Sequence, residues 1–267
     1  MTTELACLDG RVAPVAETSI GVGDEGFLRG DGVFEVIRIY GGRPFALAEH
    51  LDRIERSAQN LRLGYPVPRG ELEAEAAELL AARGGDRFDG CLRIVLTRGG
   101  RRLLMTEALP FAPARARLGF VTFAPTRLLD GIKSLSYAAN MLAGRLARER
   151  GFDEALLVTP HGRVLEAPTS SIFWVGGDGV LATPPLGEHI LASITRDRII
   201  ALADVEERPT TTDDVLRSSE AFLASTTREV QPIAAIEDRE FSHAGAAGEL
   251  TMAAAAALRA HVEASLG

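Results

Sequence analysis

The sequence predicts an α/β protein of two domains, and three of its features support this. The chain has 267 residues, of which 46% are hydrophobic, enough to bury one large core or two of ordinary size. Short apolar runs typical of strands alternate with segments in which apolar residues recur at helical spacing. Residues 110–117 carry two prolines and small residues between such segments. We therefore expect a smaller N-terminal α/β domain over 1–115 and a larger C-terminal domain over 116–267.

In the first half, the hydrophobic period changes from that of strands to that of a helix at Leu47. Apolar residues then recur at Leu51, Ile54 and Leu61. Arg53 lies beside this apolar stripe, so its side chain could point toward the core. Gly84-Gly85 is a C-terminal signal for a second helix. Strands are expected at 5–8, 12–15, 33–40, 44–47 and 91–97, and helices at 47–61 and 71–83.

Residues 21–32 are rich in glycine and resemble, at first sight, a dinucleotide-binding loop. They lead into the expected strand 33–40 rather than into a helix, so no helix N-terminus is available for a pyrophosphate. A loop in which two backbones approach closely is the better interpretation.

The second half follows the same alternation of elements. Ser193 or Thr195 is placed to cap a helix that continues through Ala203. Strands are expected at 118–123, 155–159, 163–166, 171–175, 180–182, 221–225 and 230–236, and the other helices at 137–149 and about 246–264.

Charge and composition exclude several classes of function. The net charge of −8 argues against a nucleic-acid or anionic-membrane partner, since either requires a basic face. Cys7 and Cys91 match no metal or redox spacing, and we expect free thiols in a reducing compartment and no bound metal. Residues 1–5 lack the pattern of a signal peptide, and the apolar run 252–258 is too short to span a bilayer. These features predict a soluble cytoplasmic protein.

A single residue indicates the chemistry. Of the twenty-nine basic residues, only Lys133 is a lysine. A lysine differs from arginine in offering an amine that loses its proton when desolvated and attacks a carbonyl to form a Schiff base. Leu128, Leu129 and Ile132 precede it and make its surroundings apolar. Pyridoxal phosphate is the expected carbonyl partner, and the alternative is an ordinary surface lysine.

Other segments offer what such a cofactor needs. Hydroxyls at Ser193 and Thr195 open a helix, which is a favourable anion site, and residues 225–227 place further hydroxyls and amides in a turn. Glu166 ends an expected strand before small residues, where a carboxylate can reach a pyridine nitrogen. Taken singly, a threonine in the position of Thr195 is more often only an N-cap, and a carboxylate in the position of Glu166 is more often a solvated residue at the end of a hairpin. Their presence together with the solitary lysine favours the cofactor site.

The order of these motifs resembles the class IV aminotransferases, the fold-type IV pyridoxal-phosphate enzymes, which include branched-chain and D-amino acid transaminases and aminodeoxychorismate lyases. The resemblance covers nearly the whole chain. It runs through residues 30–36, 49–53, 131–140, 151–155, 165–173, 183–185, 194–196 and 225–230.

The resemblance implies a role for each matching residue. Lys133 would be the catalytic Schiff-base lysine, and Glu166 the partner of the pyridine nitrogen. Arg53, Thr195 and Thr226 would hold the phosphate, together with the Ile194 amide. It also implies a two-domain α/β fold with the cofactor between the domains, a C-terminal domain that binds most of it, and a homodimer.

Transamination between a small amino acid and a 2-keto acid is the activity we expect. Arg93 and Arg98 are candidates for binding the substrate carboxylate, with surface arginines as the alternative. An arginine at position 98 is similar to the pattern of D-amino acid transaminases, but Phe34 stands where those enzymes have a tyrosine. An arginine at position 93 is similar to the pattern of branched-chain enzymes, but their tyrosine after the lysine falls one residue later than Tyr137. Thr227 is a further candidate substrate contact.

Two other functions stay open at this point. An aminodeoxychorismate lyase, releasing 4-aminobenzoate and pyruvate, would use the same cofactor and lysine. The E. coli-type lyase pattern has threonine where this chain has Glu35, which favours the transaminase. A non-catalytic small-molecule binding protein is the other alternative, and the presence of both Lys133 and Glu166 disfavours it.

Overall fold

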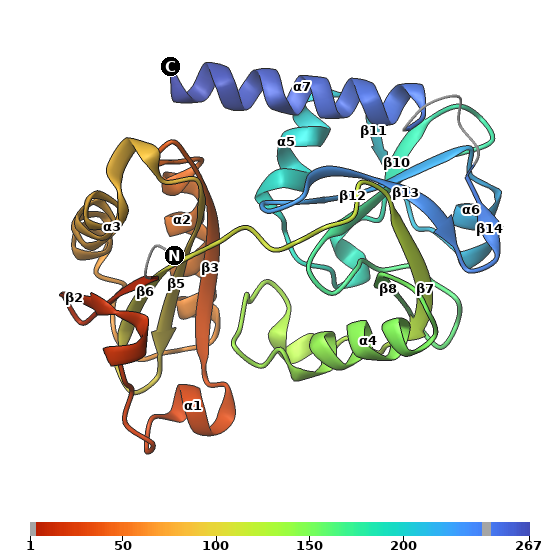
Figure 1. The fold of residues 1–267 in the computed structure, drawn as a ribbon. Coiled ribbons are helices and arrows are strands. Elements are labelled where there is room, and N and C mark those ends of the chain that lie inside the picture. Colours follow the sequence, from red (N-terminus) through yellow and green to blue (C-terminus); the bar gives the residue numbers. More distant parts are fainter. Residues whose placement is uncertain (1–3, 242–246) are drawn as a thin grey trace. The chain divides into compact units, whose positions relative to one another are not determined.

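The computed structural model describes residues 4–241 and 247–267, and the chain divides into two compact units (Figure 1). The first unit comprises the chain up to Pro110 together with Gly131–Tyr137 and Leu266. The second comprises Phe111–Asp130, Ala138–Ser265 and Gly267. The main crossing from the first unit to the second therefore follows Pro110, near the expected boundary at 115. Residues 131–137, which carry Lys133, cluster with the first unit.

The first unit is built on an antiparallel six-stranded sheet in the order β2-β1-β6-β5-β3-β4. Three helices belong to the same unit. The strands are β1 (Leu5–Leu8), β2 (Arg11–Pro14), β3 (Gly32–Tyr40), β4 (Arg43–Pro44), β5 (Gly90–Thr97) and β6 (Arg102–Glu107), and the helices are α1 (Glu25–Arg29), α2 (Leu47–Asn60) and α3 (Arg69–Arg83).

Strand register divides the side chains of this sheet between two faces. Glu35, Ile94, Leu104 and Cys7 are aligned in one row across β3, β5, β6 and β1, and all four are fully buried or nearly so. Helix α2 packs on β3, and α3 on β6 and β1. Because successive side chains of a strand point to opposite faces, Phe34 lies on the face opposite to this row.

Close backbone approach explains part of the glycine-rich segment. Lys133 and Leu135 run antiparallel to β3: Phe34 N donates to Lys133 O at 3.0 Å, and Leu135 N to Gly32 O at 2.8 Å. A Cβ atom on Gly32 would lie 2.5 Å from the carbonyl oxygen of Leu96 and 2.7 Å from Cδ1 of Leu135. Glycine is therefore required where residues 133–135 pass along the strand, in agreement with the interpretation of residues 21–32 as a loop of close approach.

The second unit contains an eight-stranded mixed sheet. Its main order is β11-β10-β9-β12-β13-β7-β8, with β14 paired to β13, and β7 lies parallel to both β8 and β13. The strands are β7 (Ala116–Thr122), β8 (Glu154–Val158), β9 (Ser171–Val175), β10 (Leu181–Thr183), β11 (Val205–Glu207), β12 (Glu220–Ser225), β13 (Glu229–Ile236) and β14 (Arg239–Glu240), and the helices are α4 (Ala138–Glu149), α5 (Ile194–Leu202), α6 (Thr212–Arg217) and α7 (Glu249–Leu266).

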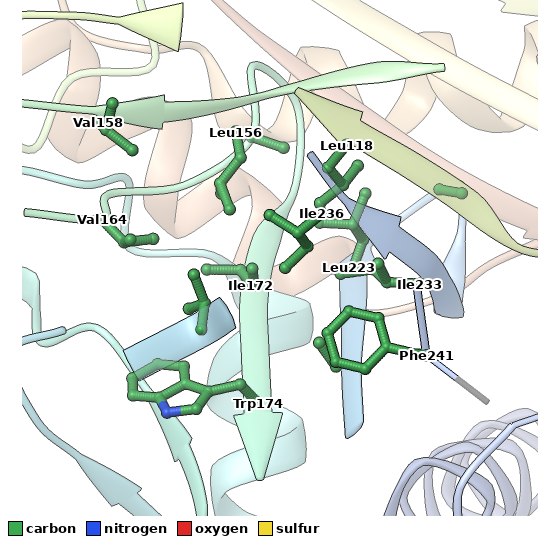
Figure 2. Packing of buried hydrophobic residues seen from close by; sticks show 14 of the residues in the cluster. Leu118, Leu156, Val158, Val164, Ile172, Trp174, Leu223, Ile233, Ile236 and Phe241 are labelled. Atoms are coloured by element: carbon green, nitrogen blue, oxygen red, sulfur yellow. The ribbon is translucent and has the colours of Figure 1, made fainter. Parts of the chain in front are cut away.

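Both faces of strand β9 are buried, and its alternate residues serve different clusters. Ile172 and Trp174 pack with Leu118, Leu223 and other apolar residues in the cluster drawn in Figure 2. Phe173 on the opposite face stacks on Phe222, with ring centroids 4.8 Å apart. A strand buried on both faces reads as a continuous apolar run, which is what residues 171–175 show.

The α/β fold class predicted from the sequence is confirmed, whereas several short elements were not foreseen. Elements α1, β6, β11, α6 and β14 were not predicted from the sequence. The strand expected at 163–166 is wrong, because Arg163 and Val164 form only isolated bridges, to Thr211 and Val158. The expected start of the last helix at Ala246 lies outside the described residues, as do Met1–Thr3. Cys7 and Cys91 are buried and free, as expected. Among the described residues, none of the helices combines the length and apolar composition needed to cross a membrane.

Candidate active site

Lys133 lies half-buried in the first unit, and its backbone is fixed by two neighbouring elements. Its carbonyl accepts the hydrogen bond from β3 described above, and its N–H donates to Oγ of Ser57 on α2 at 3.1 Å. Its Nζ lies 4.4 Å from the ring centroid of Phe34 and 5.9 Å from that of Tyr137. The two rings themselves meet edge to face at 5.4 Å. Two aromatic rings therefore lie beside the amine, close enough to attract its charged form.

Arg53 points inward, as the sequence allowed, and meets a buried carboxylate. Its Nε and Nη2 donate to Oε1 and Oε2 of Glu35, each at 2.6 Å. Nδ1 of His50 lies 2.7 Å from Oε2 of the same carboxylate. His50 and Arg53 are three residues apart on α2, which puts both on the face that covers β3. Ser57 follows one turn later, so a single helix face carries Arg53 and the contact to Lys133.

These partners set the ionisation of the buried group. Burial alone would raise the pKa of the Glu35 carboxyl, but the attraction and hydrogen bonds of Arg53, together with His50, lower that pKa to about 2. Burial lowers the pKa of His50, Glu35 opposes this, and the positive charges of Arg53 and Lys133 add to the lowering. At neutral pH, Glu35 is therefore ionised and His50 neutral. Since an ionised carboxylate only accepts, His50 donates from Nδ1.

The two arginines expected to bind a substrate carboxylate both contact carboxylates of the protein. Arg93, on the same face of the sheet as Phe34, donates to Glu107 through Nε at 2.6 Å and Nη2 at 2.9 Å. Its guanidinium lies 5.6 Å from the Phe34 ring centroid. Arg98 donates to Asp31 at 2.5 Å, and its other nitrogens donate to the carbonyls of Arg62 at 2.8 Å and Leu61 at 3.0 Å. Arg98 thus holds the end of α2 to the loop before β3.

In the second unit, topology gathers the remaining candidates at one end of the sheet. Strands β9 and β12 are antiparallel, with Ala224 opposite Ser171, so the turn after β12 and the loop before β9 meet at the same end. Strand β10 is antiparallel to β9, so the chain leaving β10 toward α5 starts there too. Thr226 and Thr227 lie in the first of these segments, Glu166 in the second, and Ile194 and Thr195 at the end of the third.

The carboxylate and the helix N-terminus are positioned by backbone contacts. Oε1 of Glu166 accepts from Leu191 N at 3.2 Å, and the Glu166 carbonyl accepts from Leu157 N at 2.9 Å. Ser193 caps α5 by accepting from Arg196 N at 3.3 Å. Of the two cap residues that the sequence left open, Ser193 is therefore the cap. Ile194 and Thr195 occupy the first turn, where helical N–H groups favour an anion.

Two buried hydroxyls at this end of the sheet are polar groups that the described protein residues leave unsatisfied. Oγ of Ser170 and Oγ of Ser171 are buried, and neither finds a hydrogen-bond partner among the described residues. Buried hydroxyls are nearly always paired in folded proteins. Hydroxyls, helix N–H groups and a carboxylate at one end of a sheet form a donor and acceptor set that fits a phosphorylated heterocycle.

The structure thus places the predicted residues in two groups. In the first unit, Lys133, Tyr137 and Arg93 lie around the ring of Phe34. Arg53 lies on the opposite face of that sheet, paired with Glu35. In the second unit, one end of the sheet carries Glu166, Ile194, Thr195, Thr226 and Thr227. Sequence reasoning assigned no role to the contacts of Arg53. The available signal was the spacing of His50 and Arg53, which places both on the helix face that packs against β3.

Known proteins resemble this chain over most of its length. Residues 32–236 match the family model described as amino-transferase class IV. The chain is 34% identical to a putative branched-chain-amino-acid aminotransferase of Methanocaldococcus jannaschii, over 91% of each chain. It is 31% identical to a D-alanine aminotransferase of Bacillus licheniformis, over 91% of this chain and 92% of that one.

A solved structure shows the same fold. The branched-chain aminotransferase of Thermoproteus uzoniensis, in its structure with norvaline, is 30% identical, with a TM-score of 0.86 over 97% of this chain and 95% of that one. The family predicted from the sequence is confirmed, and with it the prediction of an enzyme. This chain belongs to the class IV aminotransferase family.

Proposed function

We propose that the protein is a pyridoxal 5'-phosphate-dependent transaminase that moves an amino group between a small amino acid and a 2-keto acid. The observation that carries the proposal is Lys133. It is the only lysine of a class IV aminotransferase chain, its backbone is held by β3 and α2, and its amine faces two aromatic rings. A related chain of this fold from Mycobacterium tuberculosis is described in a PLP-bound form.

The residues present fit the cofactor. Lys133 would hold its aldehyde, and the Glu166 carboxylate its ring nitrogen. Arg53, Thr195 and Thr226, with the Ile194 amide, would hold its phosphate. When bound, the cofactor supplies a carbonyl that exchanges an amino group and a protonated ring that accepts electrons from a breaking Cα–H bond.

The protein's own groups perform the proton transfer. With the cofactor bound, Nζ of Lys133 would accept the proton from the substrate α-carbon and pass it to the cofactor. The Glu166 carboxylate would accept a hydrogen bond from the protonated ring nitrogen and favour that protonated form.

Candidate substrate contacts lie around the same aromatic pair. Phe34 and Tyr137 would contact the side chain of the amino acid, and Thr227 would contribute a hydroxyl. Arg93 is the stronger candidate for the carboxylate because its guanidinium lies beside the ring of Phe34. It pairs with Glu107 through Nε and Nη2, whereas Arg98 donates through Nε, Nη1 and Nη2 to Asp31 and two carbonyls. The relatives named above act on branched-chain amino acids or D-alanine, and both remain candidate substrates here.

We further propose that the enzyme works in the cytoplasm as a homodimer. Buried free thiols suit a reducing compartment. Large apolar side chains at Phe27, Leu142 and Leu146 are 72%, 49% and 41% exposed in the single chain, and such exposure is typical of surfaces that meet a partner.

The proposal is tested by incubating the purified holoprotein with a panel of L- and D-amino acids. We expect the visible absorbance of the lysine-bound cofactor to convert to that of its amine form, with a keto acid appearing. If no amino acid reacts, and pyruvate and 4-aminobenzoate form from aminodeoxychorismate, the protein is a lyase. A bound cofactor with neither reaction would indicate a binding protein.

A further inference from the structure

We propose that Glu35 and His50 are positioning residues that direct the guanidinium of Arg53 toward the cofactor phosphate. The inference rests on the proposed function, in which Arg53 is a phosphate contact, and it adds two residues to which the sequence analysis gave no role in the site.

Glu35 occupies a place in the fold that stability alone does not favour. It lies in a row with Ile94, Leu104 and Cys7, on the sheet face covered by α2 and α3, and it is fully buried. Burying a carboxylate costs several kcal/mol of desolvation, and a well-packed apolar residue in its place is often neutral or stabilising. The buried pair of Glu35 and Arg53 is therefore better explained by the orientation that the carboxylate imposes on the guanidinium.

The geometry shows which orientation that is. A guanidinium is a rigid plane, and Glu35 engages the edge that carries Nε and Nη2, both at 2.6 Å. This contact fixes the plane and directs Nη1 away from Glu35. A bidentate pair therefore selects one rotamer of a long side chain, which otherwise samples many. A phosphate that binds Arg53 then meets a preorganised donor and does not have to order it.

His50 completes the support. Its Nδ1 donates to Oε2 of Glu35, the oxygen that also accepts from Nη2 of Arg53. The carboxylate is thereby held from two directions by groups on one helix face. Because His50 is neutral, it orients Glu35 without adding a second positive charge beside Arg53.

A second buried ion pair in the same unit offers a matched control. Glu75 on α3 is 6% exposed and accepts from Nε of Arg102 at 2.9 Å and from Nη2 at 2.6 Å. Glu71 also contacts Arg102, at 2.8 Å. This cluster joins α3 to β6 and includes none of the candidate site residues. Glu75→Gln therefore removes a comparable buried charge without touching Arg53.

The experiment compares the binding of pyridoxamine 5'-phosphate with that of pyridoxamine to the full-length protein freed of cofactor. Neither compound forms a bond to Lys133, and they differ only in the phosphate. For Glu35→Gln we expect binding of the phosphorylated compound to weaken by about ten-fold or more, since hydrogen bonds to a charged group are disturbed. Binding of pyridoxamine should stay within about two-fold of wild type. Glu75→Gln should leave both affinities unchanged.

An equal change for the two compounds in Glu35→Gln, or no change for either, would overturn the inference. Should this variant fail to fold, His50→Gln carries the test, because it keeps the Glu35–Arg53 pair and removes one support. It should weaken binding of the phosphorylated compound alone, by a few-fold, and a wild-type ratio of the two affinities would count against the inference. Failure of the proposed function would look different, because the wild-type protein would then show no preference for the phosphorylated compound.

Discussion

Two buried regions of the chain, one in each unit, differ in their chemistry. In the second unit, Ile172, Trp174 and Leu223 belong to a cluster made of apolar side chains only (Figure 2). In the first unit, the face covered by helices includes a carboxylate, Glu35, with His50 and Arg53 packed against it. An apolar core stabilises a fold without setting the direction of any functional group. A buried polar group gives less net stability but fixes the direction of its partners.

The comparison teaches that stability and chemistry rest on different residues of this chain. Changes in the apolar cluster should lower the free energy of unfolding, whereas changes around Lys133 should alter reaction and binding with little effect on the fold. Four predictions separate these effects.

The largest effect is expected from Lys133→Arg. The charge is kept, but a guanidinium does not give up its proton and cannot replace the amine as nucleophile or base. Transamination should fall by roughly a thousand-fold or more, while the thermal unfolding midpoint stays near that of wild type. Appreciable residual turnover would show that another group performs the chemistry.

Leu223→Ala should lower the stability of the second unit. Leu223 is fully buried in the apolar cluster, so its truncation should lower the free energy of unfolding by about 2–5 kcal/mol. Trp174, the only tryptophan, lies in the same cluster and reports unfolding of this unit by its fluorescence in urea. Leu128→Ala, at a residue 89% exposed, is the control and should change stability by less than about 0.5 kcal/mol.

Acid should weaken the first unit through its buried polar set. As the pH falls below about 6.5, His50 takes up a proton in the unfolded chain but resists it in the fold, so stability decreases. Below about pH 4.3 the unfolded Glu35 is protonated while the folded carboxyl, with its pKa of about 2, is not, and the loss continues toward that value. Between about pH 4.3 and pH 2, urea unfolding followed by circular dichroism should show a smaller loss of stability in Glu35→Gln than in wild type. An equal loss in both proteins would contradict the assignment.

The smallest effects should distinguish the two arginines. Arg93→Gln is expected to raise KM for the amino acid by about ten-fold, because a carboxylate contact is lost beside Phe34. Arg98→Gln should mainly lower the free energy of unfolding, by about 1–3 kcal/mol, because Asp31 and two carbonyls lose their donor. Steady-state kinetics and urea unfolding of both variants would decide, and the reverse pattern would return Arg98 to the substrate site.

Much of the fold could be predicted from local signals. The strand at β3, the helix at α2 and the end of α3 at Gly84 follow from hydrophobic period and capping. Strand β6 was missed because Arg102–Glu107 does not alternate and is stabilised by pairing with β5 and with β1, about a hundred residues earlier in the chain. Helix α6 did carry a signal, since Thr211 and Asp214 form a capping box.

The identity of the candidate site residues could be predicted from the sequence, but the partners that these residues contact could not. A solitary lysine and a family motif were enough to select Lys133. The placement of residues 131–137 beside β3 depends on tertiary packing, and no local pattern encodes it. The same holds for the partners of Arg93 and Arg98: sequence shows an arginine but not the carboxylate, Glu107 or Asp31, that it meets.

The central claim is that Lys133 holds an aldehyde cofactor covalently, and one measurement tests it most directly. The native holoprotein is reduced with borohydride and digested, and its peptides are analysed by mass spectrometry. We expect a phosphopyridoxyl group on Lys133, in the peptide that surrounds residue 133. A protein that carries no such group there after reduction would contradict the account.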